Sequence, residues 1–172
     1  QRGYGVVYTI APSALNGNLI WAGSDTGLIH LTRDGGKNWK DVTPRGLGDW
    51  SKISLIEASH FDPAEAYAAV DRHRMDDQKP YLYRTRDYGA SWQLITEGFG
   101  ASAFLRAVRE DPQNRGLLFA GTELGAYVSF DDGDRWQWLQ LNLPTVSVHD
   151  VVIHGDDPVS YTHLRAHETG RN

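Results

Sequence analysis

An eight-residue phrase occurs three times in the 172-residue chain, and it constrains the fold more than any other feature. The copies occupy residues 32–39, 85–92 and 129–136 and share the pattern Ser/Thr-x-Asp-x-Gly-x-x-Trp. The fixed positions are Thr32, Asp34, Gly36 and Trp39, then Thr85, Asp87, Gly89 and Trp92, then Ser129, Asp131, Gly133 and Trp136. A phrase that recurs along a chain is the signature of a repeat architecture, in which similar units pack side by side.

Each copy lies between two short runs of strand-forming residues, and this arrangement predicts a β-hairpin. In such a hairpin the aspartate can accept hydrogen bonds from backbone N–H groups of the turn. The glycine is expected to have a positive φ, which other residues resist. The tryptophan is expected to fold back as an apolar plug against the neighbouring unit. All three residue types are therefore interpreted as structural rather than catalytic.

The spacing of the copies fits a unit of four strands. Asp87 and Asp131 are 44 residues apart, and a nine-residue polar insert at 72–80 explains the larger distance from Asp34 to Asp87. A period of ~40–50 residues is typical of one blade of a β-propeller. The predicted fold is all-β, a partial β-propeller of about three four-stranded antiparallel blades and the first strand of a fourth.

Apolar runs separated by turn signals such as Asn16-Gly17 locate the strands, and no helix periodicity is present over a useful length. The predicted strands are 6–10, 19–24, 28–32 and 40–42, then 53–59, 66–70, 81–83 and 93–95, then 104–110, 117–122, 126–128 and 137–139, then 148–154. The propeller domain is predicted over residues 1–158, with blades at about 4–48, 49–100 and 101–147 and a further blade starting at 148–158.

Composition excludes several classes of function. The formal net charge is −5, which argues against a nucleic-acid partner because such proteins need a basic face. The chain has no cysteine, so it has no disulfide or thiol chemistry, and no apolar run approaches the ~20 residues of a membrane-spanning helix. No cofactor is predicted.

The C-terminal segment 159–172 does not continue the repeat and is predicted to be non-native or disordered, because it resembles a translated sequencing adaptor. His163, His167 and Glu168 imitate part of a metal site, but zinc needs at least three ligands held by a fold, so no metal is predicted. The chain begins Gln-Arg-Gly-Tyr without a signal peptide and is interpreted as an interior segment of a longer protein.

The repeated phrase resembles the Asp-box, or bacterial neuraminidase repeat, of β-propellers such as sialidases, xyloglucanases and sortilin-type receptors. Further phrases, including residues 18–29, 70–77, 108–112, 121–132 and 141–145, resemble bacterial proteins of the sortilin-type Asp-box group, often labelled glycosyl hydrolases. The resemblance covers about residues 2–156. It implies a secreted or periplasmic propeller in which the boxes lie on outer hairpins, and in which the channel binds a protein, peptide or glycan ligand.

Candidate binding residues lie on the predicted innermost strands and in the insert. Counting back from Asp62-Pro63 and Asp111-Pro112 places Glu57 and Arg106 at matching positions, where they could pair across the channel. His60 and Arg109 form a second pair of positions. The insert adds Asp71, Arg72 and His73, followed by Asp76 and Asp77, on a loop that either binds a ligand or is a solvated surface.

The alternative function is part of a glycoside hydrolase, which needs two carboxylates ~5–9.5 Å apart. The candidates are Glu57, Glu110, Asp111 and Glu123, and no pair among them is distinguished by the sequence. Glu110-Asp111 precedes a proline and is interpreted as a turn, and Glu123 takes the place of Asp25 in a turn between strands. Trp50 is either a sugar-stacking platform or, the preferred interpretation, a cap on a gap between blades. The primary hypothesis is a non-catalytic ligand-binding scaffold.

Overall fold

The computed structural model describes residues 5–139 and 147–153, which contain three four-stranded antiparallel sheets. The strands of the first sheet are β1 (Val7–Pro12), β2 (Ile20–Ser24), β3 (Ile29–Thr32) and β4 (Lys40–Asp41). Those of the second are β5 (Lys52–Ala58), β6 (Ala66–Asp71), β7 (Tyr81–Thr85) and β8 (Gln93–Leu94). Those of the third are β9 (Leu105–Glu110), β10 (Leu118–Thr122), β11 (Gly125–Ser129) and β12 (Gln137–Trp138). Each sheet keeps its strands in sequence order, as a meander.

The three predicted blades are confirmed, with strand ends that differ from the predictions by no more than two residues. The expected strand at 148–154 is not confirmed: residues 147–152 form no regular strand and Ile153 makes an isolated bridge, while His154 lies outside the described residues. The segment still takes the place of a first strand, because the N–H of Val148 donates to the Thr122 carbonyl (2.9 Å). The predictions for residues 159–172 and for 141–145 also lie outside the described residues.

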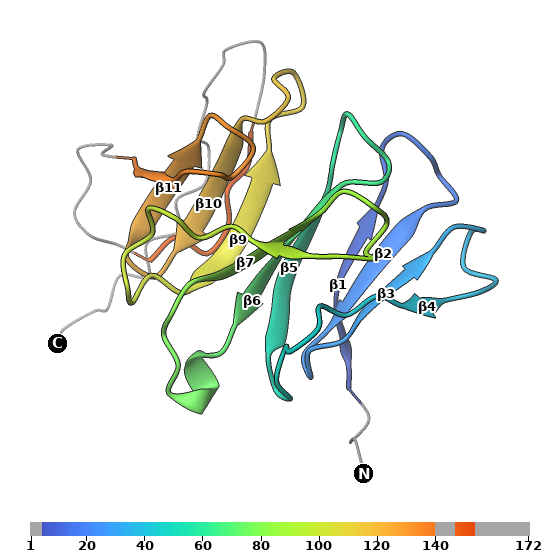
Figure 1. Cartoon of the computed structure of the whole chain (residues 1–172), viewed down its shortest axis with the longest axis horizontal. Helices are drawn as coiled ribbons and strands as arrows, with labels where there is room; N and C mark the ends of the chain where they lie inside the picture. Colours follow the sequence, from blue (N-terminus) through green and yellow to red (C-terminus); the bar gives the residue numbers. More distant parts are fainter. Residues whose placement is uncertain (1–4, 140–146, 154–172) are drawn as a thin grey trace, which may run out of the picture.

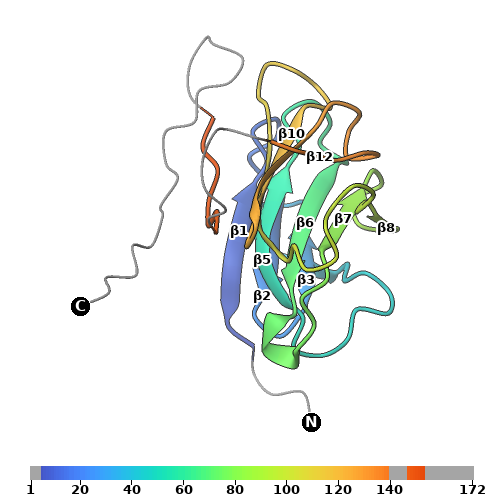
Figure 2. The same ribbon diagram turned by 90° about the vertical axis from the view of Figure 1, so that its left-hand side faces the viewer.

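The sheets lie side by side, with β5 between β1 and β9 (Figure 1). In the view turned by 90°, β1 lies at one side of the three sheets and β8 at the other (Figure 2). The first strands of neighbouring sheets therefore adjoin along one edge of the molecule, as they do around the channel of a propeller. Every residue of β6, β10 and β11 is buried, since these middle strands are covered on both faces.

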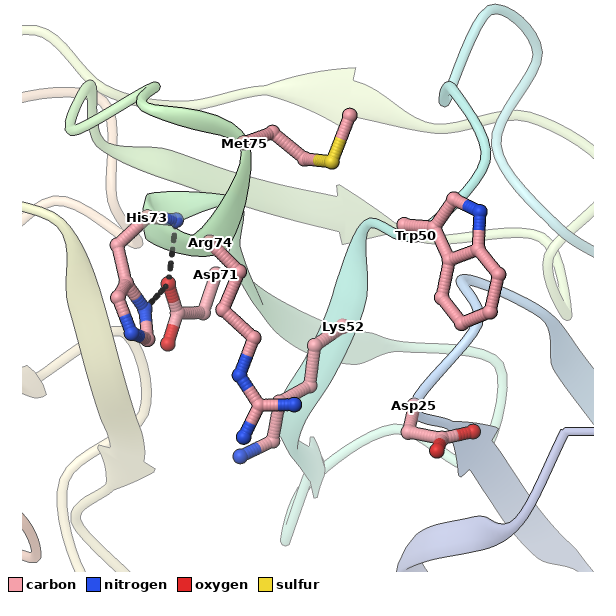
Figure 3. A pocket seen from close by; sticks show the side chains of 7 residues that line it. All are labelled: Asp25, Trp50, Lys52, Asp71, His73, Arg74 and Met75. Atoms are coloured by element: carbon pink, nitrogen blue, oxygen red, sulfur yellow. Dashed lines mark hydrogen bonds and ion pairs between the residues drawn. The ribbon is translucent and has the colours of Figure 1, made fainter.

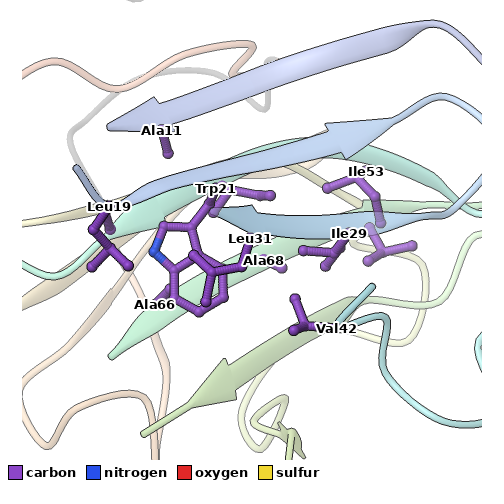
Figure 4. Close-up of a cluster of buried hydrophobic side chains, with 12 residues drawn as sticks. Ala11, Leu19, Trp21, Ile29, Leu31, Val42, Ile53, Ala66 and Ala68 are labelled. Atoms are coloured by element: carbon purple, nitrogen blue, oxygen red, sulfur yellow. The ribbon is translucent and has the colours of Figure 1, made fainter. Parts of the chain in front are cut away.

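Two apolar cores fill the spaces between the sheets. The first core joins Trp21, Ile29 and Leu31 to the facing side chains Ala66 and Ala68 of β6 (Figure 4). The second core lies between sheets two and three and is built by Tyr67, Leu82, Ile95, Leu105, Leu118, Tyr127 and Trp136, among others. A smaller cluster covers the outer face of the third sheet, where Val148 and Val151 pack on Phe119 and its neighbours.

The three repeat hairpins, residues 32–39, 85–92 and 129–136, share one set of hydrogen bonds. In the first, the Thr32 hydroxyl donates to Asp34 Oδ1 (2.9 Å) and accepts from the Gly36 N–H (2.9 Å). Asp34 Oδ1 also accepts the N–H of Asn38 (2.9 Å), which closes the turn. The second and third hairpins repeat these contacts within 0.1 Å through Thr85–Asp87 and Ser129–Asp131. Each carboxylate therefore bonds to its own turn, although Asp34 and Asp87 also line one pocket between the first two hairpins.

The glycines of the phrase have the expected positive φ, of 95°, 79° and 87° at Gly36, Gly89 and Gly133. The residue before each glycine is also left-handed, and it is a non-glycine residue in two hairpins, Tyr88 (φ 58°) and Asp132 (φ 61°). Two consecutive left-handed residues reverse the chain tightly, and the hydroxyl and carboxylate bonds to the turn hold it in this conformation.

The tryptophans contact the preceding sheet where one is present. The Trp92 indole N–H donates to the Val42 carbonyl (2.7 Å), and its ring meets Trp21 edge-on with centroids 6.0 Å apart. The Trp136 indole N–H donates to the Ile95 carbonyl (3.0 Å), the equivalent position of the second sheet. No sheet precedes β1 among the described residues, and Trp39 is 46% exposed. The expected plug therefore forms in two hairpins of the three.

Candidate functional site

The connections divide into two groups because each sheet is an antiparallel meander. Turns within the first and last strand pairs, including the repeat hairpins, lie at one end of the sheets. Connections from second to third strands, and from one sheet to the next, lie at the other end, which we call the pocket face; it comprises residues 25–28, 43–51, 72–80, 96–104 and 123–124. Each fixed carboxylate of the phrase is thus separated from the pocket face by the length of a strand.

A pocket of about 130 Å³ lies on the pocket face, between the connections of the first two sheets (Figure 3). Its lining residues are Asp25, Trp50, Lys52, Asp71, His73, Arg74 and Met75. They come from the end of β2, the link between the first two sheets, the start of β5, and the insert after β6. The nine-residue insert supplies three of them, so the feature that lengthens the second repeat is also the feature that forms the pocket wall.

Asp71 and His73 fix the shape of the insert. Asp71 ends β6 and is 3% exposed. Its Oδ1 accepts the N–H of His73 (2.9 Å) and lies 2.6 Å from His73 Nδ1, and these contacts start the short 3₁₀ turn η1 (His73–Met75). The His73 ring stacks on Phe104 with centroids 5.0 Å apart. The insert is thereby attached to the link that leads into β9 as well as to its own sheet.

Asp71 is also the start of an ionic chain along the pocket face. Arg106 lies 4.0 Å from Asp71 Oδ2 and donates to Glu123 Oε2 (3.1 Å), which in turn accepts from the Ser147 hydroxyl (2.7 Å). Four buried side-chain polar atoms of the described residues lack a hydrogen-bond partner in the protein, and three of them are here: Asp71 Oδ2, Arg72 Nε and Arg106 Nε. Polar groups in this corner therefore exceed what the described part of the chain itself can satisfy.

Trp50 forms the rim of the pocket. It is 60% exposed and has φ 63°, a conformation that bulky side chains rarely adopt. Its N–H donates to the Thr26 carbonyl (3.2 Å), and the next residue, Ser51, is buried and donates to the Gly48 carbonyl (2.6 Å). The ring is largely exposed at the rim and does not close the gap between the first two sheets, which corrects the preferred interpretation of Trp50 as a cap between blades. Backbone strain of this kind occurs most often at binding and active sites.

The strand register shows one acidic residue per sheet at the end of the second strand. Asp25, Asp71 and Glu123 each lie five positions after the equivalent residues Ile20, Ala66 and Leu118, which begin β2, β6 and β10. Comparison of the repeats in the sequence placed Asp25 and Glu123 at equivalent positions. It did not identify Asp71 as the third equivalent residue, because the insert interrupts the second repeat at that point. Asp25 and Asp71 line the same pocket, whereas Glu123 binds Arg106.

The expected pairing of Glu57 with Arg106 is wrong. Glu57 lies opposite Tyr67 in the ladder and Arg109 lies opposite Phe119, so Glu57 corresponds to Arg109. A difference in turn geometry caused the error. Asp62-Pro63 lies in the middle of its turn, whereas Asp111-Pro112 begins directly after β9. Arg106 is the extra residue of a β-bulge, a position that Ser54 occupies in the second sheet.

Glu57, His60 and Arg109 are instead brought together with Glu110, at the end of the sheets away from the pocket. Arg109 lies 4.0 Å from Glu57 Oε2, which also accepts the N–H of Glu110 (3.2 Å). The buried Glu110 carboxylate accepts from the Ser59 hydroxyl (2.9 Å) and the His60 N–H (2.7 Å). Burial raises the pKa of Glu57 to about 7, partly opposed by Arg109, and burial also raises the pKa of Glu110.

Of the predicted loop residues, Asp71 and His73 line the pocket, while Arg72 lies beside it with its guanidinium over the Tyr81 ring at 5.5 Å. Sequence reasoning missed Lys52, Arg74 and Met75 as pocket residues. The sequence does contain a signal that the link between the first two sheets could form part of a site, because Trp50 follows two glycines in a polar stretch. Asp76 and Asp77 do not line the pocket; Asp77 accepts from the Tyr81 hydroxyl (2.6 Å).

A second pocket, of about 370 Å³, lies between the first and second repeat hairpins. Its lining includes Trp39, Asp34, Asp87 and Tyr88, and the Arg33 guanidinium lies 3.9 Å from the Tyr88 ring centroid.

Within residues 5–139 and 147–153 no three His, Asp or Glu side chains are grouped so as to hold a metal ion. The same residues contain no helix of the length and apolarity needed to cross a membrane.

No protein-family model matches the sequence, and no curated protein matches it. Solved structures do resemble the fold. YCF48 bound to D1 peptide is 18% identical with a TM-score of 0.62, and the match covers 78% of this chain and 40% of that one. The Niastella koreensis GH74 enzyme is 14% identical with a TM-score of 0.68, covering 86% and 24% of the two chains.

The β-propeller domain of Myceliophteria thermophila Cps50 (Swd1) is 13% identical with a TM-score of 0.62, covering 86% of this chain and 45% of that one. The fold is a partial β-propeller. The chain spans less than half the length of these three structures. Identities this low show the shared fold and no more, so the site must supply the argument for function.

Proposed function

We propose that the chain is part of a sortilin-like Asp-box β-propeller that binds a peptide or protein ligand on its pocket face. The three hairpins have the hydrogen bonding expected of a structural Asp-box. The observation that carries binding is Trp50, a large aromatic side chain exposed at the rim of a pocket on a left-handed backbone. A secreted or periplasmic location remains a prediction of the family resemblance.

The volume of the pocket favours a peptide over a whole sugar or cofactor. Sites for small molecules usually enclose ~300–1,000 Å³, whereas a 150 Å³ cavity holds about one benzene ring. A pocket of about 130 Å³ therefore takes one side chain of a longer ligand. The resemblance to YCF48, whose structure contains a D1 peptide, is compatible with this size argument.

Peptide selection from a random phage-displayed library on the 172-residue chain tests the proposal. Enriched peptides should bind the Trp50→Ala variant at least about tenfold more weakly, the effect expected of an aromatic anchor in a small interface. Trp138→Ala is the matched control, since Trp138 is 51% exposed on β12, outside the pocket. Enriched peptides that bind the Trp50 variant as well as the parent would contradict the proposal.

A glycoside hydrolase is the second candidate function, favoured by Glu57. A partly exposed carboxyl with a pKa of about 7 suits a general acid. The described residues offer it no free partner, because Glu110 is occupied by Ser59 and His60 of the turn after β5, Asp111 by the N–H groups of Gln113 and Asn114, and Glu123 by Arg106. Glycan hydrolysis that disappears in Glu57→Gln, while Trp50→Ala keeps it, would establish this function instead.

A further inference from the structure

We infer that the pocket selects an acidic side chain, aspartate or glutamate, with apolar residues two positions before and after it in the ligand. This inference rests on the proposed peptide binding and adds the chemistry of the residue that enters. It is carried by the charges of the lining: which of them already have partners within the described chain, and which remain accessible to a ligand.

The two cations of the lining have no carboxylate partner among the described residues. Lys52 makes a cation–π contact, with Nζ 3.7 Å from the Tyr8 ring centroid, and forms no ion pair there. Arg74 projects from η1 into the same pocket and is exposed (Figure 3). Two cations that line one small space repel each other, and an anion placed between them relieves this repulsion.

The two carboxylates of the lining are less accessible to a ligand than the cations. Asp71 is 3% exposed, its Oδ1 is bonded by His73, and its Oδ2 lies 4.0 Å from Arg106. Asp25 is half-buried, and its Oδ1 accepts the Val6 N–H (2.8 Å). A ligand in the pocket therefore meets the positive charges of Lys52 and Arg74 and only the part of the Asp25 carboxylate that is not bonded to Val6. This excess of accessible positive charge favours a negative group.

The apolar part of the lining determines which residues the ligand should carry near the acidic residue. Trp50 and Met75, which are 60% and 51% exposed, present apolar surface around the cations. Alternate residues of an extended peptide are ~6.6 Å apart and share one face, so apolar side chains two positions from the acidic residue can reach these two. A carboxylate at the end of a peptide has the same charge, and the test must distinguish it from a side-chain carboxylate.

The test uses end-capped peptides acetyl-Leu-Gly-X-Gly-Leu-amide, with X as Glu, Gln or Lys, and the Gln peptide with a free C-terminal carboxylate. Binding to the 172-residue chain is followed by NMR at the Trp50 indole N–H, assigned with Trp50→Phe. The Glu peptide should bind at least about tenfold more tightly than its Gln and Lys counterparts, as expected for charge-assisted hydrogen bonds. The advantage should shrink as salt is added.

Lys52→Met and Arg74→Met should each remove most of this preference, while Lys79→Met, in the same insert but outside the pocket, should keep it. Equal binding of the Glu, Gln and Lys peptides would overturn the acidic preference but leave peptide binding in place. Selective binding of the free-carboxylate peptide would overturn the side-chain assignment. If no peptide moves the Trp50 signal while the variants keep the parent NMR spectrum, the proposed function itself is wrong.

Discussion

The first repeat hairpin and the third have the same local structure in different surroundings. In both, the Thr or Ser hydroxyl bonds the aspartate and the glycine N–H at 2.9 Å. Trp136 of the third hairpin is 3% exposed against the second sheet, whereas Trp39 of the first is 46% exposed. The phrase therefore encodes its own turn completely, but its tryptophan contributes to a core only where another sheet lies beside it.

Replacing the tryptophans should produce the largest difference between the hairpins. Trp136→Ala should lower the free energy of unfolding by about 3–5 kcal/mol, because it removes a buried ring and its bond to Ile95. Trp39→Ala should cost less than about 1 kcal/mol, as expected for an exposed position. Urea denaturation of both variants measures this contrast. Equal losses would show that Trp39 is buried by a part of the molecule outside the described residues.

Replacing the glycines should produce the same difference between the hairpins, with smaller losses of stability. A Cβ on Gly89 would lie 2.6 Å from Val42 Cβ, and one on Gly133 would clash with Ile95 Cδ1, whereas one on Gly36 meets nothing closer than 4.0 Å. Gly133→Ala should therefore cost about 2–4 kcal/mol, from overpacking and from the positive φ. Gly36→Ala should cost about 1 kcal/mol from the positive φ alone. Similar losses at both positions would mean that φ, and not the neighbouring sheet, sets the requirement.

The comparison extends to carboxylates, whose pKa values differ between the hairpins and the interior. Bonds from Asn38 and Thr32 lower the pKa of Asp34 to about 2, while burial raises the pKa of Glu57 to about 7. The folded state thus binds more protons than the unfolded state between about pH 4.5 and 7. The stability contributed by Glu57 should fall as pH rises through this range, by at most about 1.4 kcal/mol per pH unit.

Glu57→Gln should flatten that fall, measured as the unfolding free energy at pH 5, 6 and 7. Asp34→Asn is the control, because its lowered pKa gives stability that is present above about pH 4 and lost toward pH 2, so the slope between pH 5 and 7 should not change. An unchanged slope in the Glu57 variant would indicate that this carboxyl is ionised throughout the range.

Asp87→Ala should have a small effect, similar to that of Gly36→Ala. The side chain is exposed, and water can replace its bonds to Ser91 (2.8 and 2.6 Å). A loss of about 1 kcal/mol is expected, close to that of an N-cap residue. Binding of the Glu peptide should not change, because the hairpin lies at the end of the sheets opposite the pocket. Weaker peptide binding at unchanged stability would contradict the structural role of the aspartate.

The sequence predicted most of the fold because its signals are local. Turn residues and short apolar runs fix strands and hairpins within a repeat, and three copies make each assignment more secure. The site was less predictable. Glu57 and Arg106 were matched by counting from Asp-Pro turns, but the two Asp-Pro pairs lie at different distances from the ends of β5 and β9. The expected strand at 148–154 failed as well, since strand formation there depends on partners beyond the segment.

The sequence by itself determined the repeated hairpins, with their aspartate bonds and left-handed glycines, because those interactions join residues within about five positions of one another. Tertiary structure alone decided which tryptophan is buried and that Asp25, Lys52 and Arg74 line one pocket. Those outcomes depend on the packing of neighbouring sheets and on one insert fixed by Asp71 and His73. Contacts between residues far apart in the chain leave no periodic trace in the sequence, so the fold had to be known before the site could be recognised.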